Sequence, residues 1–408
     1  MARFVIVGAG LAGAKAAEAV RERSADTEIV LVGDEPEMPY ERPPLSKGYL
    51  KGESPREEAR VHTAEWYPEH RVDLRTGVTA TAVDTAAHTV TLADGTVLSY
   101  DKLLLATGSH ARTLPFPGAD AAEVYTLRRA DDADRLKDLL GRIKRLVVIG
   151  AGWIGLEVTA AARDAGVEVT VVESADLPLV RILGPELATV FADLHREHGV
   201  DFRFGASIAG ITTQDGVATG VELADGTLIG GEAVLMAVGA APNLELATAA
   251  GLDVDAGVLV DASLRTSDPD VFAVGDIAQQ QHPVLGRRVR VEHWATALNQ
   301  PAVAAAGMLG ESVTYDELPY FFTDQYDLGM EYVGLAEPGG YDEVAFRGDL
   351  AGREFVAFWL KDGRVVAGMN VNVWDVVDAI KALILSGKQV DRDALTDPAV
   401  PLDQVLAS

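Results

Sequence analysis

Near its N-terminus the sequence reads RFVIVGAGLAGAKAAEAVRERSADTEIVLVGD at residues 3–34. An apolar run at 4–7 stops at a glycine-rich turn, apolar residues with helical spacing follow over 11–20, and a second apolar run lies at 29–32. This order predicts a strand, a helix and a parallel strand. The three glycines of the turn are typical of a dinucleotide-binding unit, which we therefore expect here.

Each residue of this motif has a physical role. Gly8 allows the tight turn, Gly10 lets the backbone approach a pyrophosphate, and Gly13 permits close contact between helix and strand. The N-terminus of the helix then supplies free N–H groups and partial positive charge for the phosphates. Asp34 ends the second strand, where its carboxylate can accept hydrogen bonds from a ribose.

The same unit occurs a second time, as LVVIGAGWIGLEVTAAARDAGVEVTVVE at residues 146–173. Its glycines are Gly150, Gly152 and Gly155, and Glu173 ends its second strand. Alternating segments with an Asp-Gly turn follow both units, at 72–100 and from residue 201, and predict a small antiparallel sheet after each. A closing strand is expected after each sheet, at 102–106 and leading into Gly239. This duplication predicts an α/β fold with two three-layer, Rossmann-like dinucleotide-binding domains.

The remaining chain changes in character. We expect one domain boundary near residue 110, where prolines follow a buried strand, and a separate antiparallel domain from residue 320, with a helix at 376–385. Asp276 ends a short strand in TSDPDVFAVGDIAQ, where it contacts a ligand or serves as an ordinary turn aspartate. His195 and His198 have helical spacing before Gly199, and we expect them in the last turn of a surface helix rather than at a metal.

Composition limits the possible functions. A net charge of -27 argues against nucleic acid or anionic membrane as a partner. The absence of cysteine excludes disulfides, thiolate metal sites and an intrinsic dithiol. The apolar runs have the length of strands, and residues 1–3 lead directly into the first strand, so we expect a cytoplasmic protein without a signal peptide.

The chain resembles the flavin-dependent ferredoxin reductases of oxygenase systems, the group of putidaredoxin reductase and biphenyl dioxygenase reductase. The resemblance rests on motifs that occur in the order of the family: GAGLAG, PYERPPLSK, LLLATG, GAGWIGLE, AVGAAPN, TSDPDVFAVGDI, VEHWATALNQ and FFTDQYD. It implies a discontinuous FAD-binding domain (1–110 and 240–318), an NAD-binding domain (111–239) and a C-terminal α+β interface domain (319–408). Pro301 departs from the family pattern, so we expect its helix to start there or to be kinked.

The resemblance also implies the cofactor sites, FAD and NAD(H), residue by residue. The expected FAD contacts are Gly8, Gly10, Ala12, Gly13, Asp34, Arg42, Lys47, Ala80, Ala106, Thr107, Gly108, Arg128, Gly275, Asp276, Glu292, His293 and Trp294. The expected nicotinamide-side contacts are Gly150, Gly152, Ile154, Gly155, Glu157, Glu173, Arg181, Val238 and Gly239.

Three residues are implied to take part in the chemistry. Hydride transfer between stacked rings is catalysed by positioning and needs no catalytic base. By the resemblance, Lys47 places a positive charge beside the reactive edge of the flavin and pairs with Glu157, where it favours the reduced, anionic ring. Lys47 as a solvated surface lysine is the alternative. Trp294 lines the flavin pocket or belongs to the core.

Electrons must leave the reduced flavin for an external acceptor, because the chain has no thiol. The family acceptor is a two-iron two-sulfur ferredoxin that serves an oxygenase, with rubredoxin or a quinone as alternatives. A redox-sensing flavoprotein like apoptosis-inducing factor is a second hypothesis. For the docking of ferredoxin, the candidates are Arg287, Arg288 and Arg290, with a solvated hairpin as the alternative. We expect a monomer or weak homodimer.

Overall fold

The computed structural model describes residues 2–407, which divide into two compact units. Unit 1 comprises residues up to 42, 56–110 and 241–319, and unit 2 comprises 43–55, 111–240 and 320 onward. The short segment 43–55 therefore belongs to unit 2, although both of its neighbours in sequence belong to unit 1. It contains the 3₁₀ turn η1 (Pro43–Ser46) and helix α2 (Gly48–Lys51), which contact α4 (Ala130–Leu140) and α5 (Trp153–Asp164).

Unit 1 is organised around a five-stranded parallel sheet with the order β19-β7-β1-β2-β3. The strands are β1 (Arg3–Val7), β2 (Glu28–Val32), β3 (Val72–Arg75), β7 (Lys102–Leu105) and β19 (Val271–Ala273). Helices α1 (Leu11–Arg23) and α9 (Trp294–Met308) pack against each other and against this sheet. The predicted strand–helix–strand unit at residues 3–34 is confirmed.

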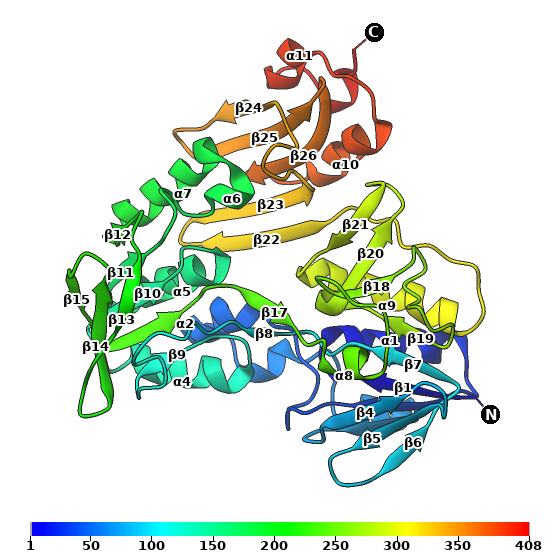
Figure 1. The fold of residues 1–408 in the computed structure, drawn as a ribbon. Coiled ribbons are helices and arrows are strands. Elements are labelled where there is room, and N and C mark those ends of the chain that lie inside the picture. The colour runs from blue at the N-terminus through cyan, green and yellow to red at the C-terminus, as the bar shows by residue number, and fades with distance from the viewer. Residues whose placement is uncertain (1, 408) are drawn as a thin grey trace. The chain divides into compact units, whose positions relative to one another are not determined.

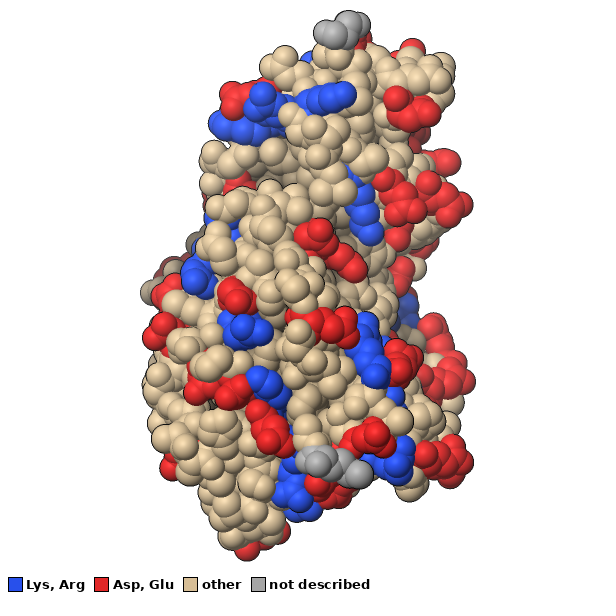
Figure 2. Space-filling model, turned by 90° about the vertical axis from the view of Figure 1, so that its right-hand side faces the viewer, with Lys and Arg blue, Asp and Glu red and all other residues tan. Residues whose placement is uncertain are grey.

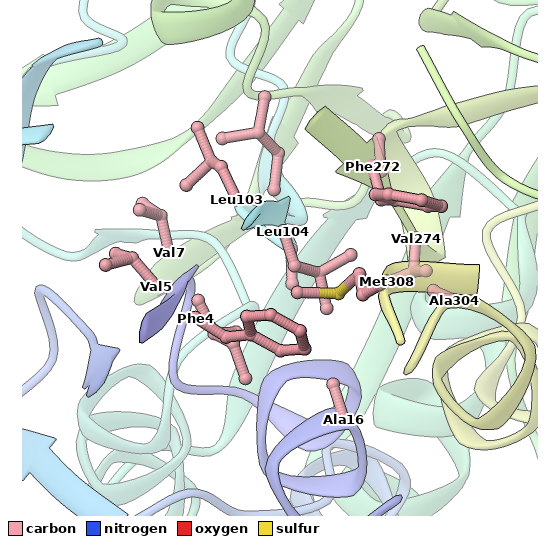
Figure 3. Close-up of a cluster of buried hydrophobic side chains, with 14 of the residues drawn as sticks. Phe4, Val5, Val7, Ala16, Leu103, Leu104, Phe272, Val274, Ala304 and Met308 are labelled. Atoms are coloured by element: carbon pink, nitrogen blue, oxygen red, sulfur yellow. The ribbon is translucent and has the colours of Figure 1, made fainter. Parts of the chain in front are cut away.

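The core of unit 1 lies between these helices and the sheet. Phe4 of β1 points toward Ala16 of α1 and Met308 of α9, while Val5 lies on the other side of the strand (Figure 3). This alternation follows from the two-residue period of a strand. Phe272 is fully buried and closes the cluster from β19. Burial of each such side chain stabilises the fold by about 1.5–3 kcal/mol.

An antiparallel meander follows the first dinucleotide unit, with strands β4 (Ala80–Asp84), β5 (Thr89–Leu92) and β6 (Val97–Ser99). The inclusion of residues 72–74 in this meander was wrong, because β3 pairs in parallel with β2 as the edge of the main sheet. An alternating apolar pattern identifies a strand but not its partner. A second three-stranded sheet contains β18 (Val258–Val260), β20 (Ala278–His282) and β21 (Arg287–Arg290).

Helix α9 does not start at Pro301, which was one of the two alternatives expected for this residue. The helix begins at Trp294, seven residues earlier in the sequence, and Pro301 lies inside it. A proline in a helix removes one backbone hydrogen bond. Packing offsets this cost, because Ala304, Ala305 and Met308 are buried against α1 and the sheet.

Unit 2 repeats the parallel architecture with the order β12-β11-β10-β16-β9. Its strands are β9 (Val124–Tyr125), β10 (Arg145–Ile149), β11 (Glu168–Val172), β12 (Asp201–Arg203) and β16 (Ala233–Met236). The second meander contains β13 (Ile208–Gln214), β14 (Val217–Leu223) and β15 (Leu228–Gly230). Strand β12 belongs to the main sheet, so the expected meander was again one strand too long. The predicted duplication of the Rossmann-like unit is confirmed.

The C-terminal part of unit 2 is a five-stranded antiparallel sheet with the order β22-β23-β26-β25-β24 (Figure 1). Its strands are β22 (Tyr320–Gln325), β23 (Leu328–Gly334), β24 (Glu343–Asp349), β25 (Glu354–Lys361) and β26 (Arg364–Val371). Helix α10 (Val377–Ser386) covers β23 and β26. One hydrophobic cluster runs from α5 and α7 (Pro185–Glu197) into this sheet, including Phe191, Phe321 and Trp359. The sheet and the second dinucleotide unit therefore share a core.

Candidate functional site

The first glycine turn, between β1 and α1, has the geometry of a phosphate cradle. Gly8 has a φ of +115°, and a Cβ there would lie 2.1 Å from the carbonyl oxygen of Ala106. A Cβ on Gly13 would lie 1.9 Å from the carbonyl oxygen of Gly8. Gly10, the N-cap residue of α1, has no side-chain cap and no heavy atom within 4 Å of its Cβ position. The first turn of α1 thus presents N–H groups to open space, which fits a pyrophosphate.

Other expected FAD contacts lie at the carboxyl ends of the strands of unit 1. Asp34 is exposed directly after β2, and residues 106–108 follow β7. Gly275 follows β19 and lies beside Ala12, since its Cβ position is 3.6 Å from the Ala12 side chain. Ligands of parallel α/β sheets bind at this edge, so the arrangement fits a dinucleotide. Ala80 is buried at the start of β4.

Asp276 is a fixed, buried carboxylate in the turn η3 (Gly275–Ile277). Its Oδ2 accepts a hydrogen bond of 2.6 Å from the Ser109 hydroxyl, and its carbonyl oxygen accepts one of 3.1 Å from Arg290 Nη1. The side-chain oxygen of Gln300 holds the backbone N–H of Gly275 at 2.8 Å. The backbone and side chain of this turn are therefore both held by the surrounding residues.

The segment 292–294 leads into helix α9 beside this turn. Burial lowers the pKa of His293 to about 4, against the opposing effect of Asp276, so its imidazole is neutral at pH 7. The indole N–H of Trp294 donates to Glu41 Oε2 at 2.8 Å, and Glu292 pairs with Arg290. Arg42 pairs with Glu35, with 2.8 Å between Nη2 and Oε1.

The second glycine turn, between β10 and α5, has the same geometry. Gly150 has a φ of +99°, and a Cβ there would lie 2.5 Å from the Ala237 carbonyl oxygen. A Cβ on Gly155 would lie 2.3 Å from the Gly150 carbonyl oxygen, while Gly152 has nothing within 4 Å. Helix α5 starts without a side-chain cap. Unit 2 therefore contains a second cradle that fits a dinucleotide phosphate.

Glu173 is tied to this second turn. Its Oε2 accepts a hydrogen bond of 2.8 Å from the N–H of Ala151, and its Oε1 accepts one of 2.8 Å from Ala175. Carboxylate oxygens have further lone pairs for ribose hydroxyls, so both roles are compatible. The ribose contact of Glu173 stays a prediction, and its hydrogen bonds to the loop were not predicted.

The remaining nicotinamide-side candidates surround the same strand ends. Val238 and Gly239 follow β16, Ile154 is exposed in the first turn of α5, and Arg181 is exposed on helix α6 (Val180–Leu183). Arg128, an expected FAD contact, precedes α4, and its backbone N–H donates to Asp132 Oδ2 at 3.0 Å.

Lys47 and Glu157 are brought together within unit 2. Lys47 Nζ lies 2.8 Å from Glu157 Oε1, and only 16% of the Lys47 side chain and 4% of the Glu157 side chain are exposed. Ser46 Oγ donates to Glu157 Oε2, and Thr323 Oγ1 donates to Oε1 at 2.6 Å. Three donors thus hold one buried carboxylate, which is the condition under which a buried charge is tolerated. Lys47 is the N-cap residue of α2 rather than a residue of the helix itself.

Two residues of β22 complete the surroundings of this pair. The ammonium of Lys47 lies 5.4 Å from the centre of the Phe322 ring, within cation–π range. Burial raises the pKa of Asp324, and the positive charge of Lys47 opposes that shift. Sequence reasoning missed Ser46, Thr323 and Phe322 as neighbours of the ion pair. The only available signal was the polar Thr323 at a buried position of an alternating strand.

His195 lies in the last turn of α7, as predicted, but not on the exposed face of that helix. It is completely buried on α7, and its Nε2 lies 2.8 Å from Gln325 Oε1. Burial lowers its pKa to about 4. His198 follows α7 and stacks on Tyr326 with 3.6 Å between ring centres. Over residues 2–407, no three His, Asp or Glu side chains are grouped as a metal site would require. No helix in the same range is long and apolar enough to cross a membrane.

Two phosphate cradles, each with an acidic residue after the second strand, together with a buried lysine–carboxylate pair, define the class of two-dinucleotide flavoprotein reductases. Comparison with known proteins identifies the family. The chain belongs to the pyridine nucleotide-disulphide oxidoreductases, whose family model matches residues 2–300, and a model described as "Reductase C-terminal" matches residues 320–406. It is therefore an oxidoreductase with FAD and NAD(H) as its cofactors.

Similar proteins come from oxygenase systems. The chain is 44% identical over 405 residues to the ferredoxin–NAD(+) reductase component of an anthranilate 1,2-dioxygenase system from Burkholderia cepacia, with 99% of each protein covered. It is 38% identical to a putidaredoxin reductase from Pseudomonas putida, over 99% of this chain and 96% of that protein. The covalent putidaredoxin reductase–putidaredoxin complex contains a chain of the same fold, with a TM-score of 0.95, 38% identity and coverage of 99% and 97%. The resemblance drawn from the motifs is confirmed.

Proposed function

We propose that this protein passes electrons from NADH through FAD to a two-iron two-sulfur ferredoxin, which delivers them to an oxygenase. The observation that carries this proposal is the segment Pro43–Ser46 with Lys47. Disulfide reductases of similar architecture carry a dithiol after the first unit, whereas this segment supplies a lysine paired with a buried carboxylate. Because the chain has no cysteine, electrons from the flavin have no internal thiol acceptor. The ferredoxin reductase names of the similar proteins support an external one.

The proposed site assigns a role to each group of residues. The turn around Gly10, together with Asp34 and Asp276, holds FAD, and the turn around Gly152, together with Glu173, holds NADH. When bound there, FAD would supply the chemistry of accepting a hydride and releasing electrons singly. Lys47 would supply a positive charge to the bound flavin, and Glu157 holds that ammonium at 2.8 Å. No acid–base residue is required, so these side chains act by positioning and by electrostatics.

The domain organisation follows from these roles. We assign residues 1–110 and 240–318 to FAD binding, 111–239 to NAD binding and 319–408 to the interface domain. Segment 43–55 packs on α4 and α5. It therefore belongs to unit 2, although the sequence on either side of it belongs to unit 1. We further propose a cytoplasmic monomer or weak homodimer.

The decisive experiment is anaerobic reduction of a purified two-iron two-sulfur ferredoxin by NADH and the FAD-loaded protein, followed by absorbance. Rapid ferredoxin reduction supports the proposal, with rubredoxin and a soluble quinone as comparison acceptors. Slow ferredoxin reduction with a long-lived complex of reduced flavin and oxidised nucleotide contradicts it, and supports the redox-sensing flavoprotein instead.

For ferredoxin docking we propose Arg287 and Arg288, which are exposed on β21. Arg290 is a weaker candidate than the sequence suggested, because its guanidinium forms an ion pair with Glu292, whereas Arg288 donates to the carbonyl oxygens of Val260 and Gln279, which do not neutralise its charge. Basic and acidic side chains are interspersed on the face of the molecule drawn in Figure 2. The local positive charge of two arginines can therefore attract an acidic ferredoxin despite the negative total charge.

A further inference from the structure

A continuous line of buried hydrogen bonds extends from Glu157 to His195. Thr323 Oγ1 donates to Glu157 Oε1 at 2.6 Å, and Gln325 Nε2 donates to Thr323 Oγ1 at 3.2 Å. His195 Nε2 lies 2.8 Å from Gln325 Oε1, and the Tyr326 hydroxyl lies 3.3 Å from His195 Nδ1. All of these residues belong to unit 2, and all except Tyr326 are almost completely buried.

The residues of this line come from three elements, α5, α7 and β22. Thr323 and Gln325 are two residues apart on β22, so they point to the same face. On α5, Glu157 is one turn beyond Trp153, and on α7, His195 is one turn beyond Phe191. Trp153 contacts both Phe191 and Phe321, with 5.5 and 5.1 Å between ring centres. An apolar layer is therefore followed, one turn further along both helices, by a polar layer that lies in the same core.

Each residue of this line donates its hydrogen bond to the next residue in the direction of Glu157. The amide oxygen of Gln325 can only accept, so His195 carries its proton on Nε2 and accepts from Tyr326 on Nδ1. The amide nitrogen of Gln325 donates to Thr323, which leaves the threonine hydroxyl proton for the carboxylate. Reversal of the amide would make Thr323 donate to Gln325 and deprive Glu157 of that bond. Aligned hydrogen bonds polarise one another, and those to a carboxylate are the strong ones.

We propose that Thr323, Gln325 and His195 are positioning residues for Glu157, which they hold in the orientation that places Lys47 beside the flavin. This inference rests on the role of the Lys47–Glu157 pair in the proposed function. Lys47 and Thr323 share Oε1 of the carboxylate, and Ser46 holds Oε2. Loss of the threonine donor concentrates negative charge on the oxygen that faces Lys47. The ammonium is then neutralised more strongly, and its stabilisation of the anionic flavin decreases.

A structural role alone would be fulfilled better by apolar side chains. Replacement of all the partners of a buried polar contact by apolar side chains of similar volume is often neutral or stabilising, whereas removal of one partner leaves the other unsatisfied. Thr323→Val is the matching substitution, because it removes the hydroxyl and keeps the shape. Thr323→Ser is the rescue variant, because it restores the donor to Glu157. Both are to be studied in the FAD-loaded protein.

The test combines stopped-flow flavin reduction at saturating NADH with the midpoint potential of the bound flavin. We expect Thr323→Val to slow flavin reduction about tenfold, with little change in the Kd of NADH, since one bond to a charged group is lost. The potential should fall by about 30 mV, the equivalent of a tenfold change in a two-electron equilibrium. Thr323→Ser should match the wild type in both. In a Glu157→Gln background, Thr323→Val should have little further effect, as a double-mutant cycle requires.

The protonation of His195, at the other end of the line, is tested by a separate measurement. In the wild type, the ¹⁵N shifts of His195 should identify a neutral ring with the proton on Nε2. Gln325→Met should abolish the preference for this tautomer. Gln325→Met should also slow flavin reduction, which keeps the proposal testable if Thr323→Val does not fold. Wild-type rates and potentials in folded Thr323→Val or Gln325→Met, with changes only in thermal stability, would overturn the inference. If Lys47→Ala also reduces its flavin at the wild-type rate, the proposed role of the ion pair fails as well.

Discussion

The ammonium of Lys47 lies 2.8 Å from the carboxylate of Glu157, and the two residues reach each other from separate elements of unit 2. Lys47 follows a turn that begins with two prolines, and Glu157 occupies the first half of α5. The polar environment of Glu157 is complete, with Lys47, Ser46 and Thr323 as its donors. Such a pair is sensitive to the loss of one partner, because the remaining charge stays buried.

Lys47→Ala is therefore expected to slow reduction of the flavin by NADH. Removal of one partner of a buried pair lowers the free energy of unfolding by about 3 kcal/mol or more. Because the positive charge beside the flavin is also lost, we expect at least a tenfold slower hydride transfer in stopped-flow measurements. Lys51→Ala is the matched control, since Lys51 lies on the same short segment but pairs with Asp164. A wild-type rate in Lys47→Ala, or an equal effect of Lys51→Ala, would remove Lys47 from the mechanism.

The preference for NADH should depend on Glu173. Glu173 directly follows β11, and no arginine occurs among residues 174–176, so its carboxylate should accept hydrogen bonds from ribose hydroxyls and repel a 2′-phosphate. Glu173→Ser or Glu173→Arg should narrow the ratio of kcat/KM between NADH and NADPH. The serine variant should also raise the KM for NADH, because the N–H of Ala151 loses its acceptor.

Asp176→Asn is the control for this experiment, because Asp176 is an exposed acidic neighbour in the following turn. It should leave the ratio unchanged. Equal kcat/KM for NADH and NADPH in the wild type would contradict the assigned role of Glu173. Arg181 is the nearby cation whose replacement would then need to be measured.

His195 should make stability depend on pH. Burial lowers its pKa to about 4 in the folded protein. The unfolded chain binds a proton near the ordinary histidine pKa of about 6.5, so this contribution to stability is present above that pH and is lost as the pH falls toward 4. Between pH 8 and pH 5 the loss amounts to about 2 kcal/mol. Denaturant unfolding of His195→Gln should show a correspondingly smaller decrease than the wild type.

A second buried histidine makes a comparison with the wild type necessary. His293 is also buried with a lowered pKa, so the wild-type curve alone does not isolate His195. The difference between His195→Gln and the wild type does. Parallel curves for His195→Gln and the wild type would contradict the prediction.

Local features of the fold could be predicted from the sequence because each depends on a short segment. The backbone at Gly8 and Gly150 has a positive φ, and a nearby carbonyl oxygen leaves no room for a Cβ, so both positions require glycine. The glycine motif shows this requirement in the sequence. The partners of strands could not be predicted in the same way. The apolar alternation at residues 72–74 and 201–203 is compatible with a meander, and only the surrounding sheet makes β3 and β12 parallel edge strands.

The candidate site was predicted unevenly for a similar reason. The glycine turns and the acids after β2 and β11 follow from a motif, whereas the pairing of Lys47 with Glu157 came from the family resemblance. The surroundings of Glu157 depend on β22, which is distant in sequence from α5. The position of His195 in the last turn of α7 could be predicted, because its spacing to His198 and Gly199 is local. Its burial against Gln325 is a tertiary effect that no short window contains.

The last prediction concerns the ferredoxin, which must approach a protein with a net charge of -27. Screening at physiological salt limits exposed charges to a reach of about 8 Å, so the charges nearest the docking site dominate over the total. Arg288→Glu should therefore raise the KM for ferredoxin, by roughly fivefold, and flatten its dependence on salt. Arg287→Glu should act in the same direction, because both side chains are exposed on β21. NADH-dependent reduction of ferricyanide, a small acceptor, should remain unchanged in both variants.

Arg290→Ala provides the contrast within the same strand. Its guanidinium contacts the carbonyl oxygen of Asp276 and the carboxylate of Glu292, so this variant should weaken the retention of FAD more than it raises the KM for ferredoxin. Flavin release is measured by fluorescence after dilution. If Arg287→Glu and Arg288→Glu leave the KM and its salt dependence unaltered, ferredoxin docks on another surface. If all three variants change the KM equally, the arginines act as one patch, and the distinction drawn from the Arg290 contacts is wrong.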